Sequence, residues 1–286
     1  MDIGDYYSKS INGFTKNPLL AVPAFVGNIL IYIITYGAMF LGIFSLYGSN
    51  IFDYSQNSTS ALNNPDIGTS SMFLGVMIIV LIITWIISSF ISSATIGMSK
   101  RIVLGERPDL GVALKYGKKY LLIILAVSFI FGILVAITIM PLIIGIILIA
   151  VDPSSGLGIV GLIIGGLITL ILMMFIFLFF IFIFQSVIVG KKSLIGSFKD
   201  SYKTVKKNIF EVIVVLIINA LIIGTISIIV ALITSFLGII PIIGLILGII
   251  ISIIVNSVIF PYFTLVLNYF YMDLKGVIPE KAEYAY

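Results

Sequence analysis

The residues best able to bind a ligand are lysines, which gather in two segments, Arg107–Tyr120 and Lys191–Asn208. A lysine ammonium pairs readily with phosphate oxygens, and near an anionic leaflet each lysine contributes about 1 kcal/mol of attraction. These segments therefore predict a site for the headgroups of membrane lipids, in particular anionic ones. Its candidate residues are Lys115, Lys118, Lys119, Lys199, Lys203, Lys206 and Lys207.

A helix would separate these charges from an apolar stripe. In the second segment the residues Leu194, Phe198, Tyr202 and Val205 recur at helical spacing, and lysines occupy much of the remaining surface. This pattern is typical of a helix that lies in the membrane interface with its apolar side toward the hydrocarbon. Such an amphipathic elbow helix could equally serve only to lead the chain into the next span. The sequence leaves both interpretations open.

Neutral polar side chains within apolar segments form the second set of candidates, represented by Asn28, Asn219 and Asn256. Buried amides either hydrogen-bond between packed helices or line a path for a substrate. The chain has no Cys and no His, which removes the commonest general base and metal ligand, and a serine would have no base to activate it. We therefore expect no enzyme activity, no cofactor and no metal site.

Six apolar segments must position these residues. The chain is 60% hydrophobic and 10% charged, whereas soluble domains carry about 25% charged residues. Helices of about 20 apolar residues span a bilayer. An all-α integral membrane protein is therefore predicted, with residues 1–286 as a single polytopic domain. The expected spans are Pro18–Leu46, Met72–Ile96, Leu121–Ala150, Leu157–Gly190, Ile209–Ser235 and Ile242–Met272.

The positions of the basic residues indicate the orientation of the spans. All 16 Lys and Arg residues fall in the two termini or in the segments 99–120 and 191–208. The connection 47–71, on the opposite side, contains Asp53 and Asp66 but no basic residue. By the positive-inside rule, we expect a multi-pass protein of the cell membrane with cytoplasmic N- and C-termini. Topology explains the short basic segments, so we expect no nucleic-acid partner.

The chain also shows signs of an internal repeat, an elbow helix followed by a hairpin of two spans, at residues 1–98, 107–190 and 191–276. Lys16-Asn17 precedes Asn28 at the spacing by which Lys207-Asn208 precedes Asn219, whereas the middle copy keeps Lys119 but has Phe131 in place of the later Asn. Small residues four apart, which allow close helix contacts, begin the second helix of each hairpin. These pairs are Ser71/Gly75, Gly161/Gly165 and Gly244/Gly248.

Two stretches resemble a known family. Ser93–Tyr120 (SATIGMSKRIVLGERPDLGVALKYGKKY) resembles the elbow passage of the glycerophosphoryl diester phosphodiesterase membrane domain and of related uncharacterised archaeal and bacterial families. Asn268–Gly276 (NYFYMDLKG) is similar to the ending of their last span. The resemblance implies a six-span helical domain without chemistry of its own, because catalysis in the phosphodiesterases belongs to a separate soluble domain. We therefore do not expect that activity here.

These observations favour a non-enzymatic membrane protein that binds lipid or organises a membrane partner, either another membrane protein or a second copy of the chain. The alternative is a transporter or channel for a small neutral or lipophilic substrate. A cavity that reaches both Asn28 and Asn219 would favour transport. A dry, glycine-packed interior with exposed basic elbows would favour lipid binding.

Overall fold

The computed structural model describes residues 2–47, 67–152 and 156–278, and this part of the chain is helical, without a strand. In chain order the elements are α1 (Ile3–Lys16), the 3-10 helix η1 (Pro18–Ala21), α2 (Val22–Tyr47), α3 (Ile67–Val103), α4 (Leu110–Val151), α5 (Gly156–Phe179), α6 (Ile183–Ile188), α7 (Leu194–Lys207), α8 (Ile209–Leu237) and α9 (Pro241–Leu274). Six apolar helical stretches are long enough to cross a membrane: α2, α3, α4, α5 continued by α6, α8 and α9. The predicted all-α class is confirmed for the described residues, with six helical stretches long and apolar enough to span a membrane.

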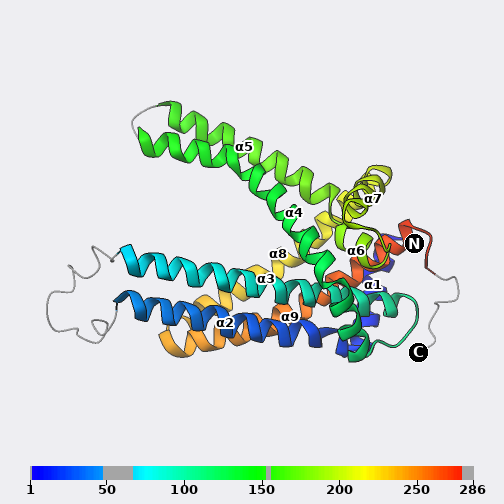
Figure 1. Ribbon diagram of the computed structural model, residues 1–286. Coiled ribbons are helices and arrows are strands. Elements are labelled where there is room, and N and C mark those ends of the chain that lie inside the picture. Colours follow the sequence, from blue (N-terminus) through cyan, green and yellow to red (C-terminus); the bar gives the residue numbers. More distant parts are fainter. Residues whose placement is uncertain (1, 48–66, 153–155, 279–286) are drawn as a thin grey trace.

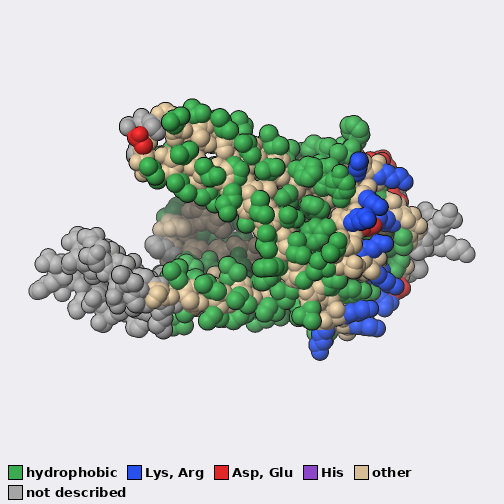
Figure 2. Space-filling model, turned by 45° about the horizontal axis from the view of Figure 1, so that its top comes forward, with side chains coloured by type: hydrophobic (Ala, Val, Ile, Leu, Met, Phe, Trp, Pro, Cys, Tyr) green, Lys and Arg blue, Asp and Glu red, His purple; other side chains and the backbone are tan. Residues whose placement is uncertain are grey.

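The spans divide into a body and an arm (Figure 1). In the body, α2, α3 and α9 pack against one another and α8 lies along α9. The arm consists of α5 and of the later part of α4, a helix that runs beside α3 in its first part and then leaves it (Figure 1). Figure 2 shows a hollow between the arm and the body at the end away from the lysines.

The two helices of the arm contact each other through glycines. A Cβ atom added at Gly145 would lie 2.6 Å from Leu162 Cα, and one added at Gly165 would meet the carbonyl oxygen of Pro141. The pair Gly161/Gly165 therefore lies at a close helix contact, as its spacing predicts. Gly75 differs, because a Cβ atom there would meet no atom within 4 Å. The expected contact of the first hairpin is therefore wrong at Gly75.

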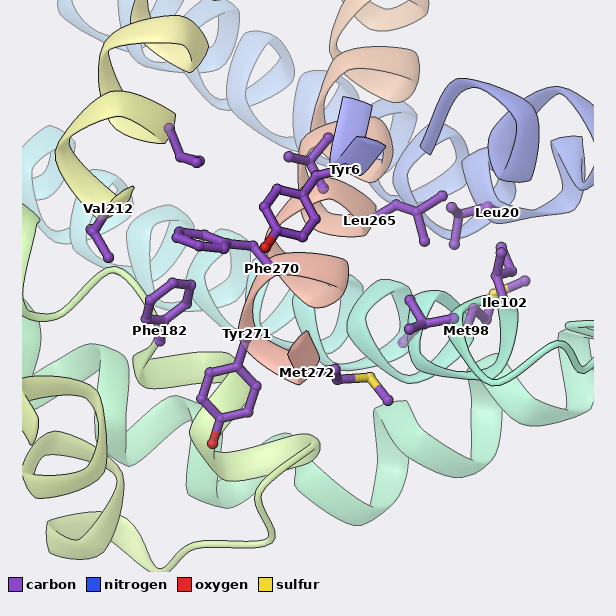
Figure 3. Close-up of a cluster of buried hydrophobic side chains, with 14 of the residues drawn as sticks. Tyr6, Leu20, Met98, Ile102, Phe182, Val212, Leu265, Phe270, Tyr271 and Met272 are labelled. Carbon is purple, nitrogen blue, oxygen red and sulfur yellow. The ribbon is translucent and has the colours of Figure 1, made fainter. Parts of the chain in front are cut away.

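A large cluster of buried hydrophobic side chains lies at the opposite end, where α1, the start of α6 and the last turns of α3 and α9 meet (Figure 3). The ring of Phe182 lies 5.4 Å from that of Phe270 and 5.5 Å from that of Tyr271. Tyr6 of α1 completes this aromatic cluster, with its ring 5.1 Å from Phe270. All four side chains are almost fully buried. This end has a packed core, whereas many large apolar side chains of the long helices remain exposed on the surface of the molecule.

Two of the elbow helices, α1 and α7, end with the same local structure, a corner at which the chain turns into a span. α1 and α7 are both 14 residues long and are followed by Asn17 and Asn208 as C-caps. In each case the amide Nδ2 donates to the carbonyl oxygen four residues earlier, at 2.9 Å. The backbone N–H of each Asn donates to the carbonyl three residues earlier. The side-chain bond satisfies a terminal carbonyl of the elbow helix, and the chain turns there into a span.

The middle elbow and the fourth span differ from the sequence-based expectation. Arg107–Tyr120 does not form a separate helix, because α4 continues without a break from Leu110, capped by a hydrogen bond from Val112 N–H to the Asp109 side chain. The expected span Leu157–Gly190 is interrupted after Phe179, and α6 begins only at Ile183. A side chain of α7 bonds the backbone freed at this interruption.

Candidate lipid-headgroup site

The lysines of the expected headgroup site lie at one end of the molecule, on the first turns of α4 and along α7 (Figure 2). All seven are exposed. None of them lies within ion-pairing distance of a described acidic group. The Lys119 ammonium lies 5.3 Å from the centre of the Tyr120 ring. This end of the protein therefore presents ammonium groups that the described part of the chain does not neutralise.

Helix α7 lies against the protein through a row of small polar residues as well as through its apolar stripe. Its buried residues are Ser197, Ser201, Thr204 and Val205. The Ser201 hydroxyl donates to the carbonyl of Phe179 at 2.8 Å and accepts from the backbone N–H of Phe182 at 3.2 Å. One serine thus bonds two backbone groups, an N–H and a carbonyl, where α5 stops and α6 begins. Because these groups are buried, their pairing is required for stability.

The predicted stripe contacts the protein as well. Phe198 packs edge-on against Phe180 with ring centres 5.4 Å apart, and Tyr202 stacks on Phe179 at 5.0 Å. Val205 is fully buried. The stripe therefore packs on the aromatic residues around the α5–α6 interruption, which helical spacing alone does not reveal. Among the apolar residues of α7, Ile195 is the most exposed.

A second group of contacts, which we call the Asp200 latch, joins α7 to α6 and to the end of α9. It consists of Asp200, Ser186, Tyr271 and Lys275. One carboxylate oxygen of Asp200 accepts hydrogen bonds from the hydroxyls of Tyr271 at 2.7 Å and Ser186 at 2.9 Å. The other accepts from the Lys275 ammonium at 2.8 Å. The latch fixes α7, and with it the lysines of this helix, to the last span.

The charge of Asp200 is maintained by these partners. Burial alone would raise the pKa of the Asp200 carboxyl. The hydrogen bonds from Lys275, Tyr271 and Ser186 outweigh burial and hold this pKa below its usual value. Asp200 therefore stays ionised over the physiological pH range and binds Lys275 as a charge-assisted pair.

Helix α1 is held at the same end by two tyrosines. The Tyr6 hydroxyl donates to a carboxylate oxygen of Asp273 at 2.7 Å, and burial with this acidic partner raises the pKa of Tyr6. The Tyr7 hydroxyl donates to Asn219 Oδ1 at 2.8 Å, and burial raises the pKa of Tyr7 to about 12. Both phenols are therefore neutral hydrogen-bond donors that hold α1 against α9 and α8.

The sequence matches, over residues 1–274, the family described as Domain of unknown function (DUF7847). The chain belongs to this family. No curated protein and no solved structure matches it. The resemblance to the glycerophosphoryl diester phosphodiesterase membrane domain therefore remains a prediction.

The three asparagines expected in the spans of this DUF7847 chain do not share one site. Asn28 Nδ2 donates to Ser257 Oγ at 3.2 Å and joins α2 to α9. Asn219, on α8, accepts the Tyr7 bond described above. Asn256 Nδ2 donates within its own helix, to the carbonyl of Ser252. Asn28 and Asn256 line one small pocket between α2, α3 and α9, and Asn219 does not line it.

Sequence analysis of this DUF7847 chain missed the latch. Asp200 is the single acidic residue in the lysine-rich segment Lys191–Asn208, and that isolation is the signal that could have singled it out. Tyr271 gives no comparable signal, because several tyrosines flank the spans and only the fold shows which one reaches Asp200.

Proposed function

We propose that this DUF7847 protein is a non-enzymatic membrane protein that binds anionic lipid headgroups at its basic end. The observation that supports the proposal most directly is the set of seven exposed lysines without a described acidic partner. Phosphate oxygens of a leaflet would supply the missing counter-charges. A membrane protein or a second copy of this chain would bind the same surface if it presented acidic groups.

The gathering of basic residues at one end supports the proposed orientation. The lysines and arginines of the described residues lie on α1, at the end of α3, in the connection to α4 (Arg107), at the start of α4, in the segment 191–207 and just after α9. These elements meet at one end (Figures 1 and 2). In our proposal this end is cytoplasmic and both termini lie there, as the positive-inside rule requires. Anionic lipids of the cytoplasmic leaflet are then within reach of the lysines.

In our proposal the headgroup site is built from equivalent elbow segments of a three-unit repeat. The matching corners at Asn17 and Asn208 support an equivalence of α1 and α7. The start of α4 takes the corresponding place in the middle unit as an uninterrupted helix. Each unit would place an elbow at the basic end, and two of the three elbows carry the candidate lysines.

Rigid attachment of α7 would make the site more than a diffuse basic surface. Ordering a flexible lysine segment on binding would oppose association through lost conformational entropy. The Asp200 latch and the Ser201 bonds already fix the helix that carries Lys199, Lys203, Lys206 and Lys207. Little backbone entropy is then lost when the lipids bind.

The experiment replaces Lys199, Lys203, Lys206 and Lys207 of the full chain with Gln. The matched control replaces the same four residues with Arg, which keeps the charge. Native mass spectrometry after release from nanodiscs counts retained phosphatidylserine and phosphatidylcholine. We expect the Gln variant to retain phosphatidylserine at least tenfold less well than the wild type, from about 1 kcal/mol per lysine. Retention equal to that of the Arg control would refute the proposal.

The transport alternative receives support from one feature, the pocket that Asn28 and Asn256 line within the spans. A path across the membrane would need further polar groups in line with this pocket. Asn219 does not supply such a group, because it lies on α8 outside the pocket and its side-chain oxygen accepts the hydrogen bond from Tyr7. The pocket therefore favours binding of a molecule within the membrane over passage through it.

A further inference from the structure

The intramembrane pocket between α2, α3 and α9 has a mixed lining and a volume of about 220 Å³. A water molecule occupies about 30 Å³ of liquid, so the pocket has room for a small polar group with several heavy atoms. Four lining residues are apolar: Ala24, Ile31, Ile91 and Phe260. The other four carry neutral hydrogen-bonding groups: Asn28, Ser88, Ser92 and Asn256.

The polar residues of the pocket lie well inside the spans. Ser88 precedes Lys100 by twelve residues, which is about 18 Å along a helix. Asn256 lies fifteen residues after Pro241, where α9 begins, and eighteen residues before the end of this helix at Leu274, so it is near the middle of α9. The hydrocarbon of a bilayer is about 30 Å thick. The pocket is thus at a depth where bulk water does not satisfy polar groups.

The described residues leave several of these groups unsatisfied. The hydroxyls of Ser88 and Ser92 make no hydrogen bond within the described part of the chain, and Ser88 is exposed. The two asparagines use their Nδ2 groups on Ser257 and on the Ser252 carbonyl, at 3.2 Å and 2.8 Å. Their Oδ1 atoms accept no hydrogen bond from a described residue. Unpaired polar groups are unfavourable in hydrocarbon, so the pocket requires a polar occupant.

The lining also restricts the chemistry of the occupant. No charged residue lines the pocket, so a phosphate or an ammonium group would be buried there without a counter-charge. Serine hydroxyls can donate and accept, while the free amide oxygens can only accept. A neutral hydroxyl, which both donates and accepts, matches this set. We infer that the pocket binds the hydroxyl end of a neutral membrane lipid, such as a diacylglycerol or a long-chain alcohol.

Ser88 provides lateral access for such a lipid. It also lines a neighbouring cavity between α3 and α4, together with Thr84, Trp85 and Ser128. There the Trp85 Nε1–H donates to Ser128 Oγ at 2.7 Å and leaves the Ser88 hydroxyl free. A lipid alcohol can therefore reach Ser88 from the hydrocarbon without crossing the charged end. This site is independent of the proposed headgroup site.

The test uses a diacylglycerol with a diazirine in one acyl chain as the probe and the full chain in phosphatidylcholine nanodiscs. Photolabelling is mapped by mass spectrometry and competed with oleyl alcohol or with its methyl ether. The ether cannot donate a hydrogen bond. The variant is Ser88→Ala combined with Ser92→Ala. The control is Thr225→Val, because the Thr225 hydroxyl donates within its own helix, α8, and lines neither of the two pockets.

We expect labelling of α2, α3 and α9 that the alcohol competes and the ether does not. The double serine variant should lose about tenfold in this competable labelling, the effect of about one hydrogen bond, and the control should keep it. Equal labelling of the double variant, equal competition by the ether, or no saturable labelling would overturn the inference and leave water as the occupant. The lysine-to-glutamine variant should label normally, which separates this result from failure of the headgroup proposal.

The thermal stability of the double variant without added lipid provides a second readout. Ser88 and Ser92 make no described hydrogen bond, so their replacement by Ala should leave the unfolding temperature unchanged or raise it. A lowered unfolding temperature would show that the two hydroxyls stabilise the fold, and would also overturn the inference.

Discussion

The basic end, which combines the ends of apolar spans with two amphipathic elbow helices, and the arm, which is apolar throughout, are stabilised in different ways. At the basic end, aromatic rings, buried tyrosines and the Asp200 latch join α1, α3, α7, α8 and α9, together with the starts of α4 and α6, into one core. In the arm, α4 and α5 contact each other mainly through glycines, and their other faces are exposed. Within lipid there is little hydrophobic drive for helices to associate, so hydrogen bonds and close packing decide where they do. The helices therefore form a packed core at the basic end, whereas the arm stands apart from the body at the other end.

Replacing Phe182 with Ala should give the largest difference between the two regions. Phe182 is fully buried between Phe270 and Tyr271, and its loss leaves a cavity. We expect the free energy of unfolding in bicelles to fall by about 3–5 kcal/mol. The matched change Phe177→Ala, at a half-exposed position of the arm, should lower it by less than about 1 kcal/mol. Equal losses would contradict the proposed difference in packing.

Replacing Asp200 with Asn tests the latch. The hydrogen bonds to a charged carboxylate disappear, and we expect a loss of about 2–3 kcal/mol with faster hydrogen exchange in α7. The folded pKa of Asp200 is lowered, so the wild-type contribution is complete above about pH 4 and disappears as the pH falls through the lowered pKa. Unfolding titrations at several pH values should converge for wild type and variant in acid. A difference that persists at low pH would assign the effect to packing.

The smallest effect is expected in the arm. Gly165→Ala would press a methyl group against the Pro141 carbonyl, and we expect a net loss of about 1–2 kcal/mol. At the neighbouring Gly166 the nearest atom would be 3.9 Å away. Gly166→Ala should therefore be neutral or stabilising by up to about 1 kcal/mol, since Ala favours helix. Thermal unfolding of both variants measures this contrast, and a stabilised Gly165→Ala protein would show that the helix contact is loose.

The spans could be predicted from the sequence because a single physical requirement, a long apolar helix, defines them. The position of the lysines outside the spans could be predicted as well, since charged residues are excluded from the hydrocarbon. Asn17 and Asn208 were noticed through their repeated Lys-Asn context, and the structure adds their common hydrogen bond. Features that depend on local sequence, such as apolar spans, charged segments and helix caps, can thus be recognised in a single sequence.

Long-range contacts were not predictable in the same way. The face of α7 that is buried depends on Phe179 and Phe182, where another helix is interrupted, and helical periodicity carries no information about that partner. The arm is apolar on all sides, so no stripe indicates which faces of α4 and α5 contact the body. Asn28 and Asn219 occupy matching positions in the sequence and have unrelated partners.

The hollow between arm and body has a practical consequence for handling the protein. Neighbouring positions of the arm, Ile143, Ile144, Ile146 and Ile147, are all exposed, so hydrocarbon rather than water will fill the space that Figure 2 shows. In a bilayer the filling is lipid tails, and after extraction it is detergent tails. We therefore expect the angle between arm and body to vary with the chain length of the surrounding lipid or detergent.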